Sequence, residues 1–145
     1  MNPARPCLPA LLALLALAAP PALAVELTVR NLNDDGAGSL RAALAALPAD
    51  QHNRITITAP FGILPLQSPL PALRGLSVEI VGNFQIIDGG GQHAMFVGNL
   101  PTTLRRLHLR AGARGSGGCV SVVGAAEFDR MQFEACRAGL GSSNA

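Results

Sequence analysis

Residues 104–109, LRRLHL, are followed 24 positions later by residues 128–133, FDRMQF. The apolar positions of the two stretches correspond one to one: Leu104 with Phe128 (128 − 104 = 24), Leu107 with Met131 (131 − 107 = 24) and Leu109 with Phe133 (133 − 109 = 24). An offset shared by three apolar positions indicates one structural unit stacked on the next. A unit this short cannot bury an apolar face alone, so the units must stack to form a common core.

The same offset joins Met95 to Cys119, Phe96 to Val120 and Gly98 to Val122. Two-residue hairpin turns are scarce, so successive strands are expected to run in the same direction. Upstream of residue 91 the 24-residue spacing fails, which predicts irregular first coils. Residues 59–75 contain four prolines and are expected to be irregular or edge-like. Alternating apolar residues predict short strands at 25–30, 55–58, 76–80, 84–87, 95–97, 103–110, 119–123 and 128–133.

One short helix is predicted after the first strand. Ser39 is a suitable N-cap, and an apolar stripe follows it at the i, i+3, i+4 and i+7 spacing of a helix. Pro48 ends this pattern. Laid across the first coil, such a helix would cover an open strand edge and an exposed core. The stripe consists of Leu40, Ala43, Leu44 and Leu47.

The first 24 residues have the pattern of a secretory signal peptide. Arg5 precedes the apolar run Leu8–Ala19, and Ala22-Leu23-Ala24 is a small-x-small cleavage site. We predict a leader at 1–24 and one mature domain at 25–145, which is 121 residues (145 − 24). The mature chain has ten Arg against nine acids, a net charge of +1. It contains no basic run that indicates nucleic acid, and no later apolar stretch long enough to span a membrane.

The offset also predicts which side chains stack on adjacent rungs. Arg110 is expected above or below Glu134, and Arg105 beside Asp129, as opposite-charge pairs. Arg106 and Arg130 form an unfavourable pair unless both turn into water. Side chains expected to point outward are His108, Arg110, Gln132 and Glu134. Side chains expected to point inward are Phe96, Leu107, Leu109, Val120, Val122, Met131 and Phe133.

The stretch from Leu27 to Leu44, with Asn33-Asp34-Asp35-Gly36-Ala37-Gly38-Ser39-Leu40-Arg41, resembles the opening of exported bacterial right-handed parallel β-helix proteins. The segments Ile87–Gly91 and Leu107–Gly112 resemble that family's recurring turns and strands. The resemblance implies an all-β, right-handed parallel β-helix of the pectate-lyase-like superfamily, with a short N-terminal capping α-helix. Relatives are surface or secreted proteins, including adhesin-like passengers and polymorphic outer-membrane proteins, and are commonly longer. The chain is therefore expected to be truncated at its C-terminus.

From this resemblance we expect a non-catalytic, structural or adhesive module that is secreted, periplasmic or on the bacterial cell surface. Its partner would be an unknown surface, matrix or polysaccharide component, and the open C-terminal coil would allow self-association. The alternative function is a carbohydrate-active enzyme of the same superfamily, a polysaccharide lyase or glycoside hydrolase.

No coherent catalytic or cofactor motif occurs in the sequence, and no cofactor is expected. Asp88, before three glycines, and His93, five residues further on, are weak catalytic candidates, and Asp88 is the best single candidate for an active-site acid. The alternative is an Asp that caps a tight glycine turn. Asp34 and Asp35 are weak calcium candidates, with loop orientation beside Arg41 as the other reading.

Two cysteines remain after processing, Cys119 and Cys136. Export permits a disulfide, but the 24-residue repeat places Cys136 over Gly112 and argues against a simple bridge. A bend in the chain would bring them together, and two buried thiols are the other possibility.

Overall fold

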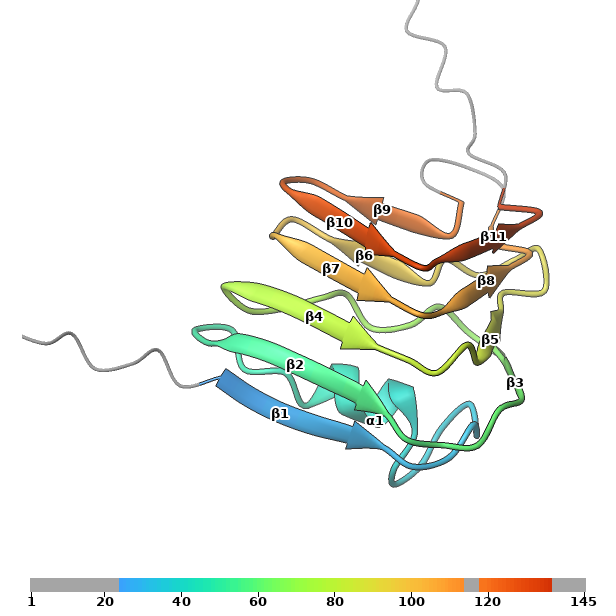
Figure 1. The fold of residues 1–145 in the computed structure, drawn as a ribbon, viewed down its shortest axis with the longest axis horizontal. Helices are drawn as coiled ribbons and strands as arrows, with labels where there is room; N and C mark the ends of the chain where they lie inside the picture. The colour runs from blue at the N-terminus through green and yellow to red at the C-terminus, as the bar shows by residue number, and fades with distance from the viewer. Residues whose placement is uncertain (1–23, 114–117, 137–145) are drawn as a thin grey trace, which may run out of the picture.

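The computed structural model describes residues 24–113 and 118–136, which form an all-β parallel solenoid of about four turns with almost no helix (Figure 1). Every strand pairing in these residues is parallel. The strands are β1 (Ala24–Val29), β2 (His52–Ile57), β3 (Ile63–Pro65), β4 (Ser77–Val81), β5 (Ile86–Asp88), β6 (Phe96–Gly98), β7 (Thr102–Arg105), β8 (His108–Arg110), β9 (Val120–Val122), β10 (Ala126–Asp129) and β11 (Gln132–Glu134). The predicted leader at 1–24 lies outside the described residues except for Ala24 and stays a prediction.

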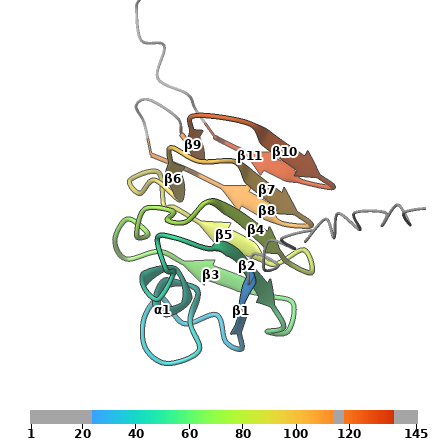
Figure 2. The ribbon, with the colours of Figure 1, turned by 90° about the vertical axis from the view of Figure 1, so that its left-hand side faces the viewer.

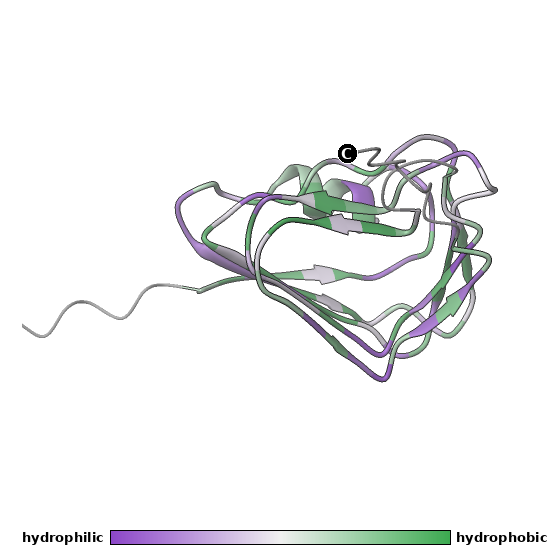
Figure 3. Cartoon of the chain, turned by 90° about the horizontal axis from the view of Figure 1, so that it is seen from above, coloured by the Kyte–Doolittle hydropathy of each residue, from purple (hydrophilic) through white to green (hydrophobic). Residues whose placement is uncertain are grey.

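Three stacks of strands surround the interior. The first sheet has the order β1-β2-β4-β7-β10, the second β11-β8-β5-β3 and the third β6-β9. Viewed from above, the three stacks form the sides of a tube, and the chain passes from one side to the next within each coil (Figure 3). Figure 2 shows the same coils from the side, with successive rungs nearly level. The predicted same-direction stack is confirmed.

The observed register confirms the 24-residue offset. Leu104 is the partner of Phe128 and Leu109 the partner of Phe133. On the first sheet the offset reaches one coil further back than expected, because Val78 pairs with Thr102 (102 − 78 = 24), whereas on the second sheet Ile86 pairs with His108 at an offset of 22 (108 − 86). Earlier coils are irregular, as expected: β1 and β2 are offset by 28 residues (52 − 24), and β2 and β4 by 25 (77 − 52).

Left-handed corners break two of the predicted strands. The expected strand 103–110 is divided into β7 and β8 by Arg106, whose φ is 52°, and the expected strand 128–133 is divided by Arg130, whose φ is 51°. Phe84 has φ 63° and is a corner rather than the start of a strand, so β5 begins at Ile86. Each corner turns the chain from the first sheet to the second, a bend that alternating hydrophobicity does not encode.

Inward-facing apolar residues form columns that persist through the irregular coils. One column runs Leu27, Ile55, Ile80, Leu104 and Phe128 through the first sheet. A second runs Leu64, Ile87, Leu109 and Phe133. Within the first column, Ile55, Ile80 and Leu104 are 0% exposed, whereas Leu27 is only partly buried and Phe128 is 46% exposed, because each coil needs a neighbour to cover it.

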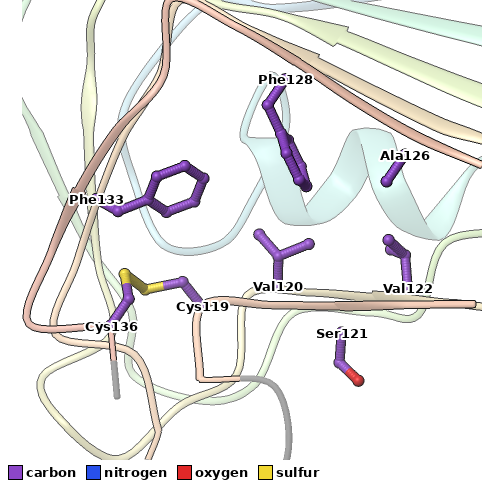
Figure 4. Close-up of a pocket in the computed structure, with 8 residues that line it drawn as sticks. All are labelled: Cys119, Val120, Ser121, Val122, Ala126, Phe128, Phe133 and Cys136. Atoms are coloured by element: carbon purple, nitrogen blue, oxygen red, sulfur yellow. A yellow bond between two sulfur atoms is a disulfide. The ribbon is translucent and has the colours of Figure 1, made fainter. Parts of the chain in front are cut away.

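The inward assignments hold, but burial falls in the last coil. Phe96, Leu107 and Leu109 are 0% exposed. Val120, Val122 and Met131 are partly buried against the core, whereas Phe133 is 49% exposed. Phe133 is predicted to point inward, and its side chain does face the interior, but no described coil lies over it (Figure 4).

Three polar side chains also face the interior, and the sequence pattern did not identify them. Asn53 donates to Pro48 O and Arg74 O. Gln85, 0% exposed, donates to Ala59 O at 2.6 Å and accepts from Asn83 N. The Thr102 hydroxyl donates to Leu100 O. These bonds satisfy backbone groups at the corners, where the strand ladders are interrupted.

Helix α1 (Leu40–Ala45) lies in the first coil where a helix was predicted. Ser39 Oγ accepts the Ala42 N–H at 3.2 Å, and Leu40, Ala43 and Leu44 are buried in the common core. The proline-containing segment that follows in the next coil is mostly irregular, as predicted, and includes only the edge strand β3.

Candidate interaction surface

The last described coil leaves the interior open at one end. β9, β10 and β11 each lie at the edge of their sheet and have a neighbouring strand on one side only, within the described residues. Between them lies a cavity of about 520 Å³. Its lining consists of Cys119, Val120, Ser121, Val122, Ala126, Phe128, Phe133 and Cys136 (Figure 4).

Two phenylalanines are partly exposed at this end. Phe128 and Phe133 are 46% and 49% exposed, and their rings meet edge to face with centroids 5.8 Å apart. Val120 points toward them from the opposite side, while Ser121 points away (Figure 4). Exposed aromatic side chains that lie together in water mark a surface whose burial by a partner is favourable.

A disulfide between Cys119 and Cys136 closes one side of this end. Their Cα atoms are 5.3 Å apart, within bridging range. The 24-residue repeat argued against a simple bridge between these cysteines, and the local backbone geometry explains why the bond nevertheless forms. Ala135, with φ 51°, turns the chain just before Cys136. In the coil below, a Cβ on Gly112 would lie 2.7 Å from Cys119 Sγ, so the absent side chain leaves room for the bridge.

On the outer face of the first sheet, Arg105 joins the charges of three coils. Its guanidinium lies 3.2 Å from Glu79 of the coil below, and 3.1 Å from Glu127 and 3.7 Å from Asp129 of the coil above. The predicted pair of Arg105 and Asp129 is therefore confirmed. Arg54 continues the column downward, at 3.6 Å from Glu79. Opposite charges alternate along the solenoid and support its register.

On the second sheet the predicted pair of Arg110 and Glu134 occurs in register but not as an ion pair. Arg110 instead donates Nε and Nη2 to Asp88 Oδ2, at 3.0 and 2.6 Å. Glu134 lies 3.1 Å from His108 Nε2. The side chain of Asp88 is 21% exposed and that of Glu134 is 58% exposed. Because solvent weakens an exposed ion pair more, pairing with Asp88 is the more favourable arrangement for Arg110.

The side chain of Asp88 caps a turn. Its Oδ1 accepts the Gly90 N–H at 2.9 Å, as expected from the alternative prediction that Asp88 caps a glycine turn. Burial raises the pKa of this carboxyl, but the hydrogen bonds from Arg110 and Gly90 and the Arg110 charge outweigh it, so the pKa lies below its ordinary value. The structure thus gives Asp88 a basic partner that is not His93.

Asp34 belongs to a connection between α1 and the next coil. Its Oδ1 accepts from Arg41 Nη2 at 2.8 Å and from Gln67 N at 3.1 Å, and Arg41 also donates to Ser68 O and Pro69 O. Burial raises the pKa of Asp34, but the hydrogen bonds from Arg41 and Gln67 and the charge of Arg41 outweigh it, so the pKa is lowered.

Asp35 is engaged separately, since its Oδ1 accepts the Gly36 N–H at 2.7 Å. The two calcium candidates therefore use their carboxylates on neighbouring protein donors. No group of three His, Cys, Asp or Glu side chains in residues 24–113 and 118–136 is arranged to hold a metal ion.

No family model, curated protein or solved structure matches this chain. In the described ranges, no helix has the length and apolar character needed to cross a membrane.

Proposed function

We propose that this chain is a non-catalytic, secreted or cell-surface β-helix module with a structural or adhesive role. In this proposal the solenoid is right-handed and pectate-lyase-like, and α1 caps its N-terminal end. The observation that favours a binding role is the open apolar end, where Phe128 and Phe133 are half exposed beside a disulfide. A disulfide is typical of proteins in an oxidising, extracytoplasmic compartment.

The acids on the two long sheets support a structural role over catalysis. Glu79, Glu127 and Asp129 share Arg105, and Asp88 is bound by Arg110. A glycosidase needs two carboxyl groups facing one bond, one of them protonated at working pH. The lowered pKa of Asp88 makes that acid a poor proton donor at neutral pH.

Two measurements test the proposal. Expression of the full chain in a bacterium, followed by N-terminal sequencing of exported protein, should find a chain that begins at Val25. Retention of the unprocessed chain in the cytoplasm would contradict export. Assays for reducing ends and unsaturated products across pectins and other polysaccharides should show no turnover. Turnover that disappears in Asp88→Ala would establish the carbohydrate-active alternative.

A further inference from the structure

We propose that the open end of the solenoid binds a polypeptide strand in which apolar residues alternate with Arg or Lys. The open end is defined as the exposed edges of β9, β10 and β11 together with the apolar cavity between them. This inference rests on the proposed binding role and names the chemistry of its partner.

The backbone and the interior define half of that chemistry. β10 has β7 on one side and no described strand on the other, so its free edge can add a strand through main-chain hydrogen bonds. Ala126 and Phe128 of β10 line the cavity. An added strand must place every second side chain over that cavity, and only apolar side chains would gain from covering Phe128.

The outward charges define the other half. The last described coil, residues 118–136, contains three acids, Glu127, Asp129 and Glu134, and one basic residue, Arg130, a net charge of −2 (1 − 3). The acidic side chains are 63%, 45% and 58% exposed. Among the described residues, Arg105 of the coil below is the only arginine that forms ion pairs with both acids of β10.

The alternation of charge along the solenoid indicates what the next rung should present. Passing from coil to coil, Arg54 is followed by Glu79, Glu79 by Arg105, and Arg105 by Glu127 and Asp129. Among the described residues, the column therefore ends on acids. A strand that puts Arg or Lys outside β10 continues the pattern and pairs with Glu127 and Asp129, whereas an acidic strand puts like charges opposite each other.

A second copy of the same end fits less well. Two open ends facing each other across a two-fold axis would bring β10 antiparallel to its copy. Inward residues must then face inward residues, so Glu127 would lie opposite Glu127 or Asp129 of the other chain. Like charges directly across a strand pair are unfavourable, and charged edges are a known device against self-pairing.

Binding of two synthetic strand peptides tests the proposal directly. One peptide alternates Val with Arg and the other alternates Val with Glu. Each carries a fluorophore, and anisotropy is followed as the purified chain 25–145 is added at 50 and 150 mM salt. The Val/Arg peptide is expected to bind at least tenfold more tightly than the Val/Glu peptide. Amide exchange of the complex should show new protection in β10.

A charge-reversed variant separates a specific edge from general electrostatic attraction. Glu127→Lys with Asp129→Lys should prefer the Val/Glu peptide. Glu26→Lys, at the exposed edge strand β1 at the other end of the same sheet, should keep the preference for Val/Arg. Equal binding of both peptides, or a preference that the double variant does not reverse, would overturn the proposal.

Self-association is measured by sedimentation at several concentrations. A wild-type chain that dimerises and binds neither peptide would show that a second copy occupies the end, and would also overturn the proposal. Failure here leaves the export and turnover tests unchanged, so it is distinguishable from failure of the proposed function.

Discussion

Arg106 and Arg130 occupy the same corner of successive coils, and both have left-handed backbone, with φ 52° and 51°. The Arg106 N–H donates to Asp129 O at 2.9 Å, just before the corner of the next coil. The left-handed conformation costs a side-chain-bearing residue about 1–2 kcal/mol, a cost that glycine does not have. The corner is thus imposed by the stacking of the coils and not by the preference of the residue.

Arg130→Gly is expected to preserve or raise stability, by up to about 1 kcal/mol, because glycine adopts φ > 0 without strain. Arg130 suits this substitution because little side-chain interaction is lost with it. Its side chain is 73% exposed, and its ion pair with Asp129 is long, at 4.0 Å. Arg130→Val should lower stability by at least about 1 kcal/mol, because a β-branched residue is a genuine outlier in this region. Urea denaturation of both variants measures the difference. Equal midpoints would show that this corner is not left-handed in solution.

Leu109→Asp is expected to unfold the domain. Leu109 is 0% exposed in the middle of its column, and an uncompensated buried carboxylate costs more free energy than a small domain can lose. Phe133→Asp is the matched control, since Phe133 is the register partner of Leu109 in the next coil but is 49% exposed. Circular dichroism should show a cooperative melt for the control and none for Leu109→Asp. A wild-type melting temperature for Leu109→Asp would show that Leu109 does not face the core.

Replacing both cysteines by serine should destabilise mainly the last described coil. The bond joins residues 17 positions apart, and closing a loop of this size contributes about 3 kcal/mol in the chain-entropy description. Because a solenoid coil contacts only its neighbours, amide exchange should accelerate in β9, β10 and β11. Amides of β1 and β2 should exchange at the wild-type rate. Uniform acceleration through all coils would instead indicate one cooperative unit.

Acid should weaken the fold through Asp34 and Asp88. The folded-state pKa of each lies below the ordinary value of 3.8. Such a group contributes stability that is fully present above the unfolded pKa and is lost as pH falls through the folded pKa. Unfolding free energies measured from pH 7 downward should therefore fall below pH 3.8, and fall less steeply in a chain carrying Asp34→Asn and Asp88→Asn. Identical slopes in that variant and the wild type would assign the acid transition to other groups.

The fold was largely predictable because stacked coils need apolar residues at the same inward-facing positions of each coil. Leu104 and Phe128 reveal the offset directly. Earlier coils could not be aligned in this way, because they have insertions in the turns, where length is not constrained by the ladder. The corners were missed because an Arg such as Arg106 gives no sign of left-handed backbone, which sequence patterns associate with glycine or asparagine.

The candidate site was only partly predictable. Asp88 was identified together with its turn-capping alternative, and the structure adds Arg110 as the partner, from a coil 22 residues later (110 − 88). That offset differs from 24, so the repeat could not pair them. The disulfide also could not be predicted from the repeat, since it depends on the bend at Ala135 and on the space beside Gly112.

The distance between spin labels on one outward column tests most directly that these coils are stacked and parallel. Glu26, Arg54, Glu79, Thr103 and Glu127 are successive register partners across the first sheet. With rungs spaced by about 4.8 Å, the backbone positions of residues 26 and 103 should lie about 14 Å apart, and those of 26 and 127 about 19 Å apart. Electron paramagnetic resonance on the two doubly labelled chains should give a longer distance for the second pair, by one rung. Equal distances, or a shorter one for the second pair, would contradict a parallel solenoid.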